Sequence, residues 1–122
     1  MKITSFNPLI LTNDIENTVK LFEDLGFERH HTKDELEDRE DISGIRMKDA
    51  SGFHVDIMET KNVRQDAVMI RMNVDDLEAA KELLESYGFK ALSGEIVQNA
   101  SSRSIGMGSP SGFAIALVQH IR

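Results

Sequence analysis

The stretch that decides the fold is LILTNDIENTVKLFEDLGF at residues 9–27, because it returns as VDDLEAAKELLESYGF at residues 74–89. Asn13 in the first copy corresponds to Asp75 in the second, so the two copies are 62 residues apart. Beyond residue 44 the offset is 60, and the further matches are Ile45/Ile105, Met47/Met107, Ser51/Ser111, Gly52/Gly112 and Phe53/Phe113. Two ordered blocks of matches indicate a tandem duplication. We therefore expect one domain, residues 1–122, built from repeated halves near 1–60 and 67–122.

Each half predicts a strand, a helix and then three strands. The clearest strands are residues 6–11, 54–58, 67–74 and 114–118, and SG dipeptides form the turns before the last strand of each half. Each helix has an expected N-cap, a capping-box Glu, a C-terminal Gly and a Phe behind it. These are Asn13, Glu16, Gly26 and Phe27 in the first half, and Asp75, Glu78, Gly88 and Phe89 in the second.

Side-chain periodicity predicts which face of each element is buried. The expected apolar stripes of the helices are Ile15, Val19, Phe22 and Leu25, and then Leu77, Ala80, Leu84 and Tyr87. The strand side chains expected against the helices are Pro8, Ile10, Phe53, Val55 and Ile57 in one half, and Ile70, Met72, Phe113, Ile115 and Leu117 in the other. The alternate strand residues lie on the opposite face, and any site built on the sheet belongs there.

Composition excludes several classes of protein. The chain has 14 Lys and Arg against 21 Asp and Glu, a formal net charge of −7, which argues against nucleic-acid or anionic-membrane partners. It has no Cys, which excludes disulfides, thiolate nucleophiles and iron–sulfur clusters. No apolar run approaches the length of a membrane span, and the N-terminal residues lack the apolar stretch of a signal peptide. We expect a cytoplasmic protein.

With these repeats and twin SGF turns, the sequence resembles the vicinal oxygen chelate superfamily, also called the glyoxalase/bleomycin-resistance/dioxygenase fold, over nearly its whole length. The resemblance implies an α+β protein in which tandem βαβββ modules form a curled mixed sheet around a cavity. It also implies a homodimer and, in metal-dependent members, a divalent cation that chelates vicinal substrate oxygens.

The family's four metal positions correspond to Asn7, Asp56, Met69 and Ala116. Only Asp56 is a good ligand for a hard cation, Asn7 is a weak one, and Met69 and Ala116 cannot serve. We therefore expect no metal and no other cofactor.

Other residues are candidates for a ligand site. Asp56 is interpreted as a general base or as a non-catalytic carboxylate, and His54 as its acid–base partner or as a polar wall. Arg71 is interpreted as an anchor for a ligand carboxylate, as a partner of Asp56 or as a cross-sheet salt bridge. Arg103 reaches a pocket mouth or is a solvated loop residue. The remaining candidate ligand-binding residues are Leu9, Met58, Met69, Met107 and Ala116, a soft apolar lining suited to a hydrophobic or aromatic molecule.

Three further segments carry weaker predictions. His30 and His31 would face opposite sides of a strand, and neither makes a metal site by itself. His120 is expected at the surface. The acidic run KDELEDRED at residues 33–41 is expected to be a solvated loop that repels anionic substrates.

Three functions remain open at this point. The leading hypothesis is a metal-independent small-molecule binding protein that sequesters a drug or metabolite. The alternative is an enzyme of the lyase, isomerase or dioxygenase type that uses Asp56 with His54 or with an atypically held metal. The third is an interaction module whose cavity is filled by its own Met and Leu side chains.

Overall fold

The computed structural model describes residues 1–30, 43–61 and 63–121 and groups the chain into two compact modules. The N-terminal module is Asn7–Val68, and the C-terminal module is Met69–Arg122 together with Met1–Phe6. The first residues belong with the C-terminal module because the Asp75 N–H donates to the Lys2 carbonyl at 3.0 Å and the Lys2 N–H donates to Asp75 Oδ1 at 2.6 Å. None of the described helices has the length and apolar character needed to cross a bilayer.

The N-terminal module contains one helix and a mixed four-stranded sheet in the order β2-β3-β4-β1. Its elements are β1 (Ile3–Thr12), α1 (Ile15–Asp24), β2 (Glu28–Arg29), β3 (Ser43–Lys48) and β4 (His54–Glu59). β1 and β4 are parallel, with Leu9 opposite Asp56, whereas β3 is antiparallel to β4.

The C-terminal module repeats this arrangement in the order β5-β9-β8-β6, with β7 also paired to β8. Its elements are β5 (Ala67–Val74), α2 (Leu77–Ser86), β6 (Lys90–Ala91), β7 (Val97–Gln98), β8 (Ser102–Gly108) and β9 (Ala114–His120). Arg71 lies opposite Ala116, as Leu9 lies opposite Asp56 in the first module. Arg71 is Leu9 plus the predicted offset of 62, and Ala116 is Asp56 plus the predicted offset of 60. The predicted α+β class is confirmed, and the strand registers of the two modules match at the predicted offsets.

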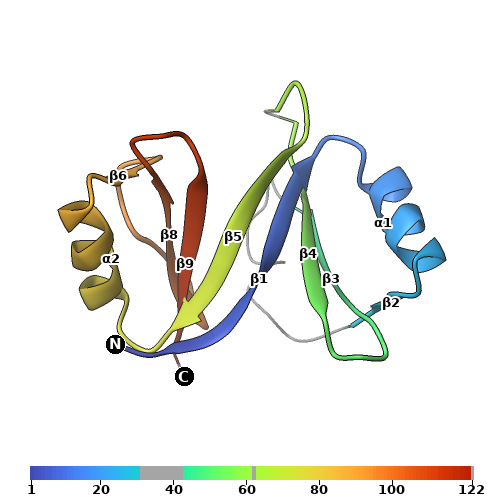
Figure 1. The fold of residues 1–122 in the computed structure, drawn as a ribbon, viewed down its shortest axis with the longest axis horizontal. Helices are drawn as coiled ribbons and strands as arrows, with labels where there is room; N and C mark the ends of the chain where they lie inside the picture. The colour runs from blue at the N-terminus through green and yellow to red at the C-terminus, as the bar shows by residue number, and fades with distance from the viewer. Residues whose placement is uncertain (31–42, 62, 122) are drawn as a thin grey trace. The chain divides into compact units, whose positions relative to one another are not determined.

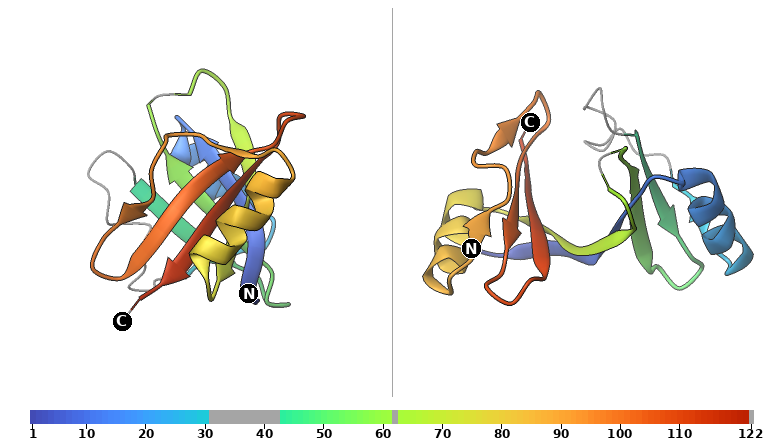
Figure 2. Two further views of the ribbon diagram at one scale, coloured as in Figure 1. Left: turned by 90° about the vertical axis from the view of Figure 1, so that its left-hand side faces the viewer. Right: turned by 90° about the horizontal axis from the view of Figure 1, so that it is seen from above.

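One helix covers one face of each sheet: α1 packs on β4, and α2 packs on β8 and β9 (Figures 1 and 2). The buried core under α1 is Val19, Met47, Val55 and Ile57. The buried core under α2 is Val74, Leu77, Ala80, Ile105, Met107, Ile115 and Leu117. The opposite side of each sheet, which we call the open face, carries the alternate strand residues.

The helix N-caps are one residue later than predicted. Asp14 Oδ1 accepts the Asn17 N–H at 3.3 Å, and Asp76 Oδ1 accepts the Ala79 N–H at 3.1 Å. An N-cap side chain must reach the third helical N–H, and Asn13 is one residue too early because α1 begins at Ile15. The predicted capping boxes with Glu16 and Glu78 were therefore wrong.

The C-terminal signals of both helices are confirmed. Gly26 and Gly88 have φ of 103° and 91°, the left-handed conformation that glycine adopts without strain. The N–H of Phe27 donates to the Phe22 carbonyl at 2.9 Å, and their rings meet edge to face at 5.4 Å.

Four side chains predicted to face the core are exposed instead, and Pro8 is exposed as well. Leu25 and Tyr87 are the C-cap residues, where the chain leaves the helical stripe, and they are 62% and 72% exposed. Phe53 and Phe113 precede their strands in the turn and are 69% and 51% exposed. Strand alternation does not extend into a turn, which explains why this part of the prediction failed.

Candidate functional site

Asp56 lies at the centre of the open face of the N-terminal module and is fully buried. Its position on β4 places it opposite Arg46 of β3, which donates from Nε to Oδ1 at 2.8 Å and from a terminal nitrogen to Oδ2 at 3.1 Å. Asn7 of β1 donates from Nδ2 to Oδ2 at 2.9 Å. Two charge-assisted hydrogen bonds and one amide hydrogen bond therefore hold the carboxylate in place.

Arg46 neutralises Asp56 inside the protein, since the Arg46 side chain is only 12% exposed. A buried carboxylate in such a bidentate pair stays ionised and has its lone pairs committed to its partners. This makes Asp56 a fixed part of the sheet, and a poor general base.

Two buried polar atoms beside this ion pair lack hydrogen-bond partners among the described residues: Asn7 Oδ1 and His54 Nε2. An unpaired buried acceptor costs about 1–3 kcal/mol, so such atoms are expected where a ligand completes the site. Burial and the nearby Arg46 guanidinium lower the pKa of His54 below 6.5, which keeps the imidazole neutral at pH 7. The site therefore offers an amide acceptor and a neutral imidazole nitrogen.

The residues at the four metal positions do not fit a divalent cation. Both oxygens of Asp56 are bound by Arg46 or Asn7, and the equivalent positions in the C-terminal module are Met69 and Ala116. Within residues 1–30, 43–61 and 63–121, no cluster of three or more His, Cys, Asp or Glu could hold a metal ion.

The C-terminal module carries a different polar group on its own open face. Arg71 is only 1% exposed and donates from Nε to Asn73 Oδ1 at 3.4 Å. Asn73 Nδ2 lies 2.9 Å from His120 Nε2, so the exposed His120 ring closes a short polar chain. Around it the face is made of small residues, with Ala116 opposite Gly106.

The remaining predicted site residues divide between the two faces. Leu9 and Met58 share the open face of the N-terminal module with Asp56. Strand alternation places Arg103 and Met107 on the helical face, where Arg103 forms a bidentate ion pair with Glu78 and Met107 is fully buried in the core under α2. His31 and the acidic run at residues 33–41 lie outside the described residues.

The sequence analysis missed Arg46, the residue that neutralises Asp56. A usable signal was present, because Arg46 alternates with the apolar Ile45 and Met47 and must face away from the helix. Pairing the last two strands of the half through the turn at residues 49–53 would have put Arg46 opposite Asp56.

No protein-family model matches the sequence, and no curated protein matches it. Several solved structures are similar to this chain. Methylmalonyl-CoA epimerase from Mycobacterium tuberculosis is 18% identical, with a TM-score of 0.72 over 98% of this chain and 90% of that one. A glyoxalase/bleomycin resistance protein/dioxygenase superfamily member from Vibrio splendidus 12B01 is 19% identical, with a TM-score of 0.63 over 97% and 99%.

A third similar structure is the Mn(II)-bound glyoxalase from Novosphingobium aromaticivorans, which is 14% identical, with a TM-score of 0.59 over 97% of this chain and 39% of that one. At such low identities the likeness establishes the fold, whereas function depends on the side chains of the site.

Proposed function

We propose that this chain, which has the vicinal oxygen chelate fold, binds a small molecule on the open face of its N-terminal module without using a metal ion. One observation carries the proposal: Asp56 is held by Arg46 and Asn7, while Asn7 Oδ1 and His54 Nε2 are buried without partners among the described residues. Among the described residues, such a site offers a metal ion the His54 imidazole without a cluster of ligands around it, and it has two hydrogen bonds left to make.

The surroundings of these two atoms define the ligand class. Leu9 lies opposite Asp56, and Met58 lies two residues further along β4 on the same face. Apolar walls with a few fixed polar groups are typical of small-molecule sites. We infer a hydrophobic or aromatic molecule that carries a hydroxyl or N–H donor for Asn7 Oδ1, which is consistent with sequestration of a drug or metabolite.

A thermal-shift screen of the full chain against phenols, anilines and their donor-free methyl ethers tests this proposal. We expect phenols or anilines to raise the melting temperature, and the ethers to raise it less, because they cannot donate to Asn7. Asn7→Met and His54→Ala copy the equivalent residues of the other module and should each remove the shift.

Gln98→Met is the matched control, because it removes an exposed strand carboxamide from the other module and should leave the shift unchanged. The proposal is wrong if no donor compound stabilises the protein, or if the Asn7 and His54 variants respond like wild type.

His54 supports a second candidate function, a proton-transfer enzyme. A neutral imidazole with an unpaired Nε2 is suited to remove a proton from carbon and return it. One of the similar structures is an epimerase, so methylmalonyl-CoA in D₂O is the first substrate to test. Deuterium incorporation that His54→Ala abolishes would support this function, and no incorporation by wild type would remove that substrate and favour binding alone.

We also propose a homodimer, as the family resemblance implies. Large apolar side chains stay exposed in each module, and a second copy would cover some of them: Phe53 and Val68 in the N-terminal module, and Ile3, Phe6, Tyr87 and Leu92 in the C-terminal module. Light scattering during gel filtration should give about twice the 13.7 kDa chain mass. A monomer at micromolar concentration would contradict the proposed dimer.

A further inference from the structure

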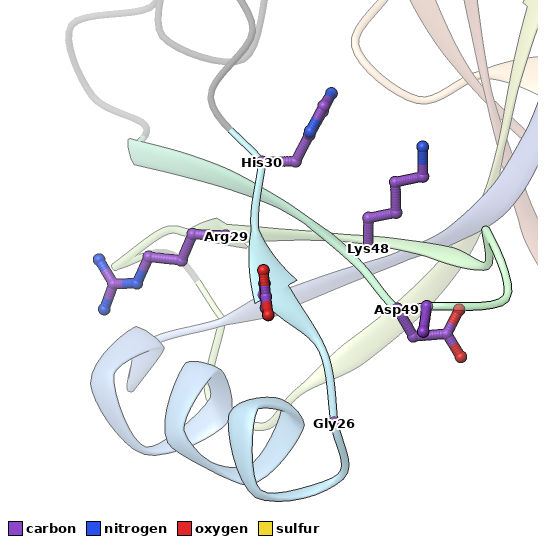
Figure 3. A pocket seen from close by; sticks show the side chains of 7 residues that line it. Gly26, Arg29, His30, Lys48 and Asp49 are labelled. Atoms are coloured by element: carbon purple, nitrogen blue, oxygen red, sulfur yellow. The ribbon is translucent and has the colours of Figure 1, made fainter.

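A pocket of about 220 Å³ opens at the outer edge of the N-terminal sheet, beside His54. It is bounded by the end of α1 and by strands β2 and β3, and its lining is Gly26, Glu28, Arg29, His30, Lys48, Asp49 and Ala50 (Figure 3). We call it the edge pocket. Its volume is below that of sites for drug-sized ligands and suits a small metabolite or ion.

The duplication supplies an internal control, because the same place in the C-terminal module is filled. The counterpart of Ala50 is Pro110, whose Cγ lies 2.8 Å from the position of a Cβ on Gly88. The counterpart of Gly88 is Gly26, which has nothing within 4 Å of that position. A proline thus covers the glycine in one copy, and an alanine leaves it open in the other.

The strand residues differ in the same sense. In the C-terminal module, Leu92 lies over two glycines of β8, with side-chain carbons 3.4 Å from the Cβ position of Gly106 and 2.8 Å from that of Gly108. The counterparts of Leu92 and Gly108 are His30 and Lys48, as the equivalent registers of β2–β3 and β6–β8 show. Apolar packing in one copy is replaced by two nitrogen-bearing side chains in the other.

His30 and Lys48 both line the edge pocket. His30, just after β2, and Lys48, at the end of β3, extend in the same direction, whereas Arg29 points away from them (Figure 3). Arg29 is 3.6 Å from Glu23 of α1, so its charge is directed to the helix. His30 and Lys48 are therefore the residues placed to bind a common ligand.

The lining carries two cations, Arg29 and Lys48, and two acids, Glu28 and Asp49, so the His30–Lys48 side is where an anion can bind. Lys48 lies opposite His54, and the His30 ring stacks on the His54 ring with centroids 6.4 Å apart and planes 18° apart. Burial is the main cause of the lowered pKa of His54, and Lys48 and His30 make smaller contributions in the same direction. Asp49, the acid at the rim, uses Oδ1 to accept the Ser51 and Phe53 N–H groups of the turn.

Two carboxylates of the lining oppose an anion, Glu28 and Asp49, and Glu28 lies directly across from Lys48 in the β2–β3 register. The nearby negative charge of Glu28 weakens anion binding at Lys48, which gives the test a variant that should improve it.

We propose that the edge pocket binds a small molecule through an oxyanion, carboxylate or phosphate, held by Lys48 and His30. The edge pocket adjoins the Asn7–His54 site at His54. Its test measures anion binding and its variants leave Asn7 and His54 in place, so this proposal can fail while the proposed function stands.

Chemical-shift titration of the ¹⁵N-labelled full chain tests this proposal, with sodium phosphate, sodium acetate and sodium chloride added at constant ionic strength. We expect saturable shifts of the Gly26, Lys48 and Ala50 amides with phosphate or acetate and none with chloride. Saturation by phosphate alone assigns a phosphate site, saturation by acetate alone assigns a carboxylate site, and saturation by both assigns a general oxyanion site.

Four variants then identify the binding residues. Lys48→Gln should weaken the affinity about tenfold, the equivalent of about 1.4 kcal/mol. Glu28→Gln should strengthen it about threefold by removing the competing carboxylate. His30→Leu copies Leu92 and should abolish the shifts. Lys90→Gln is the control, because it makes the same charge change at the position equivalent to Glu28 and should alter the affinity less than twofold.

The proposal is overturned if neither oxyanion saturates, if chloride gives the same shifts, or if Lys48→Gln behaves like Lys90→Gln. Circular dichroism checks that each variant folds. If Lys48→Gln does not fold, His30→Leu decides the outcome, and unchanged binding by that variant contradicts the proposal.

Discussion

The two modules keep the same strand register but carry different polar groups on their open faces. The N-terminal module has the ion pair of Arg46 and Asp56, where the C-terminal module has Gly106 and Ala116. On the helical faces the counterparts are alike, as with Met47 and Met107, both fully buried. Core packing therefore holds both copies to one backbone, while the open faces vary independently of it.

The largest expected effect follows from removing the Asp56 carboxylate, which the C-terminal module lacks. Asp56→Ala copies Ala116 and leaves Arg46 in a nearly closed site without its carboxylate, which should cost about 3–5 kcal/mol of unfolding free energy in urea. The double variant Asp56→Ala/Arg46→Met should recover at least part of this loss, because no uncompensated charge remains. A loss below about 1 kcal/mol for Asp56→Ala would show that the pair does not organise the N-terminal module.

The helix C-termini give a smaller difference. Gly26→Ala and Gly88→Ala both place a Cβ at positive φ, which costs about 1 kcal/mol. Gly88→Ala also forces the new Cβ against Pro110, so it should cost about 1 kcal/mol more than Gly26→Ala. Urea unfolding of the two variants measures the difference. Equal losses would contradict the filled pocket of the C-terminal module and weaken the contrast with the edge pocket.

The smallest expected effect is a pH dependence specific to the N-terminal module. The folded state lowers the pKa of His54 below its ordinary 6.5, so the unfolded chain binds the proton more tightly. Stability from this group is complete above pH 6.5 and falls as the pH drops toward the folded pKa. Urea unfolding at pH 7.5 and 5.5 should show a smaller loss for His54→Ala, which copies Ala114, than for wild type. An identical loss would show that His54 does not titrate as the structure implies.

Sequence reasoning was most successful where local physics decides the outcome. The duplication, the strand bounds of β5 and the glycine at each helix end follow from periodicity and from the left-handed conformation that only glycine adopts easily. It failed at residues such as Phe53 and Tyr87, which lie just beyond a regular element, where the chain direction changes and periodicity no longer assigns a face.

The candidate site was predicted in part. Asn7, His54 and Asp56 were identified as neighbours on one face, because alternation and the family's positions place them there. Their state could not be predicted, because it depends on a cross-strand partner: Arg46 converts Asp56 from a possible ligand or base into a neutralised structural group. The edge pocket was missed because it depends on which side chain fills a turn, as the contrast between Ala50 and Pro110 shows.

The central claim is that Arg46 and Asn7 bind both carboxylate oxygens of Asp56, so that the proposed ligand binds to this face without a metal ion. Titration of the ¹⁵N-labelled chain with paramagnetic Mn²⁺ tests it most directly, because bound Mn²⁺ broadens the signals of nearby nuclei. We predict that the Asn7 side-chain amide and the Arg46 Nε–H signals keep their intensity at one equivalent of Mn²⁺. Loss of both signals at one equivalent, reversed by chelator and absent in Asp56→Asn, would contradict the claim.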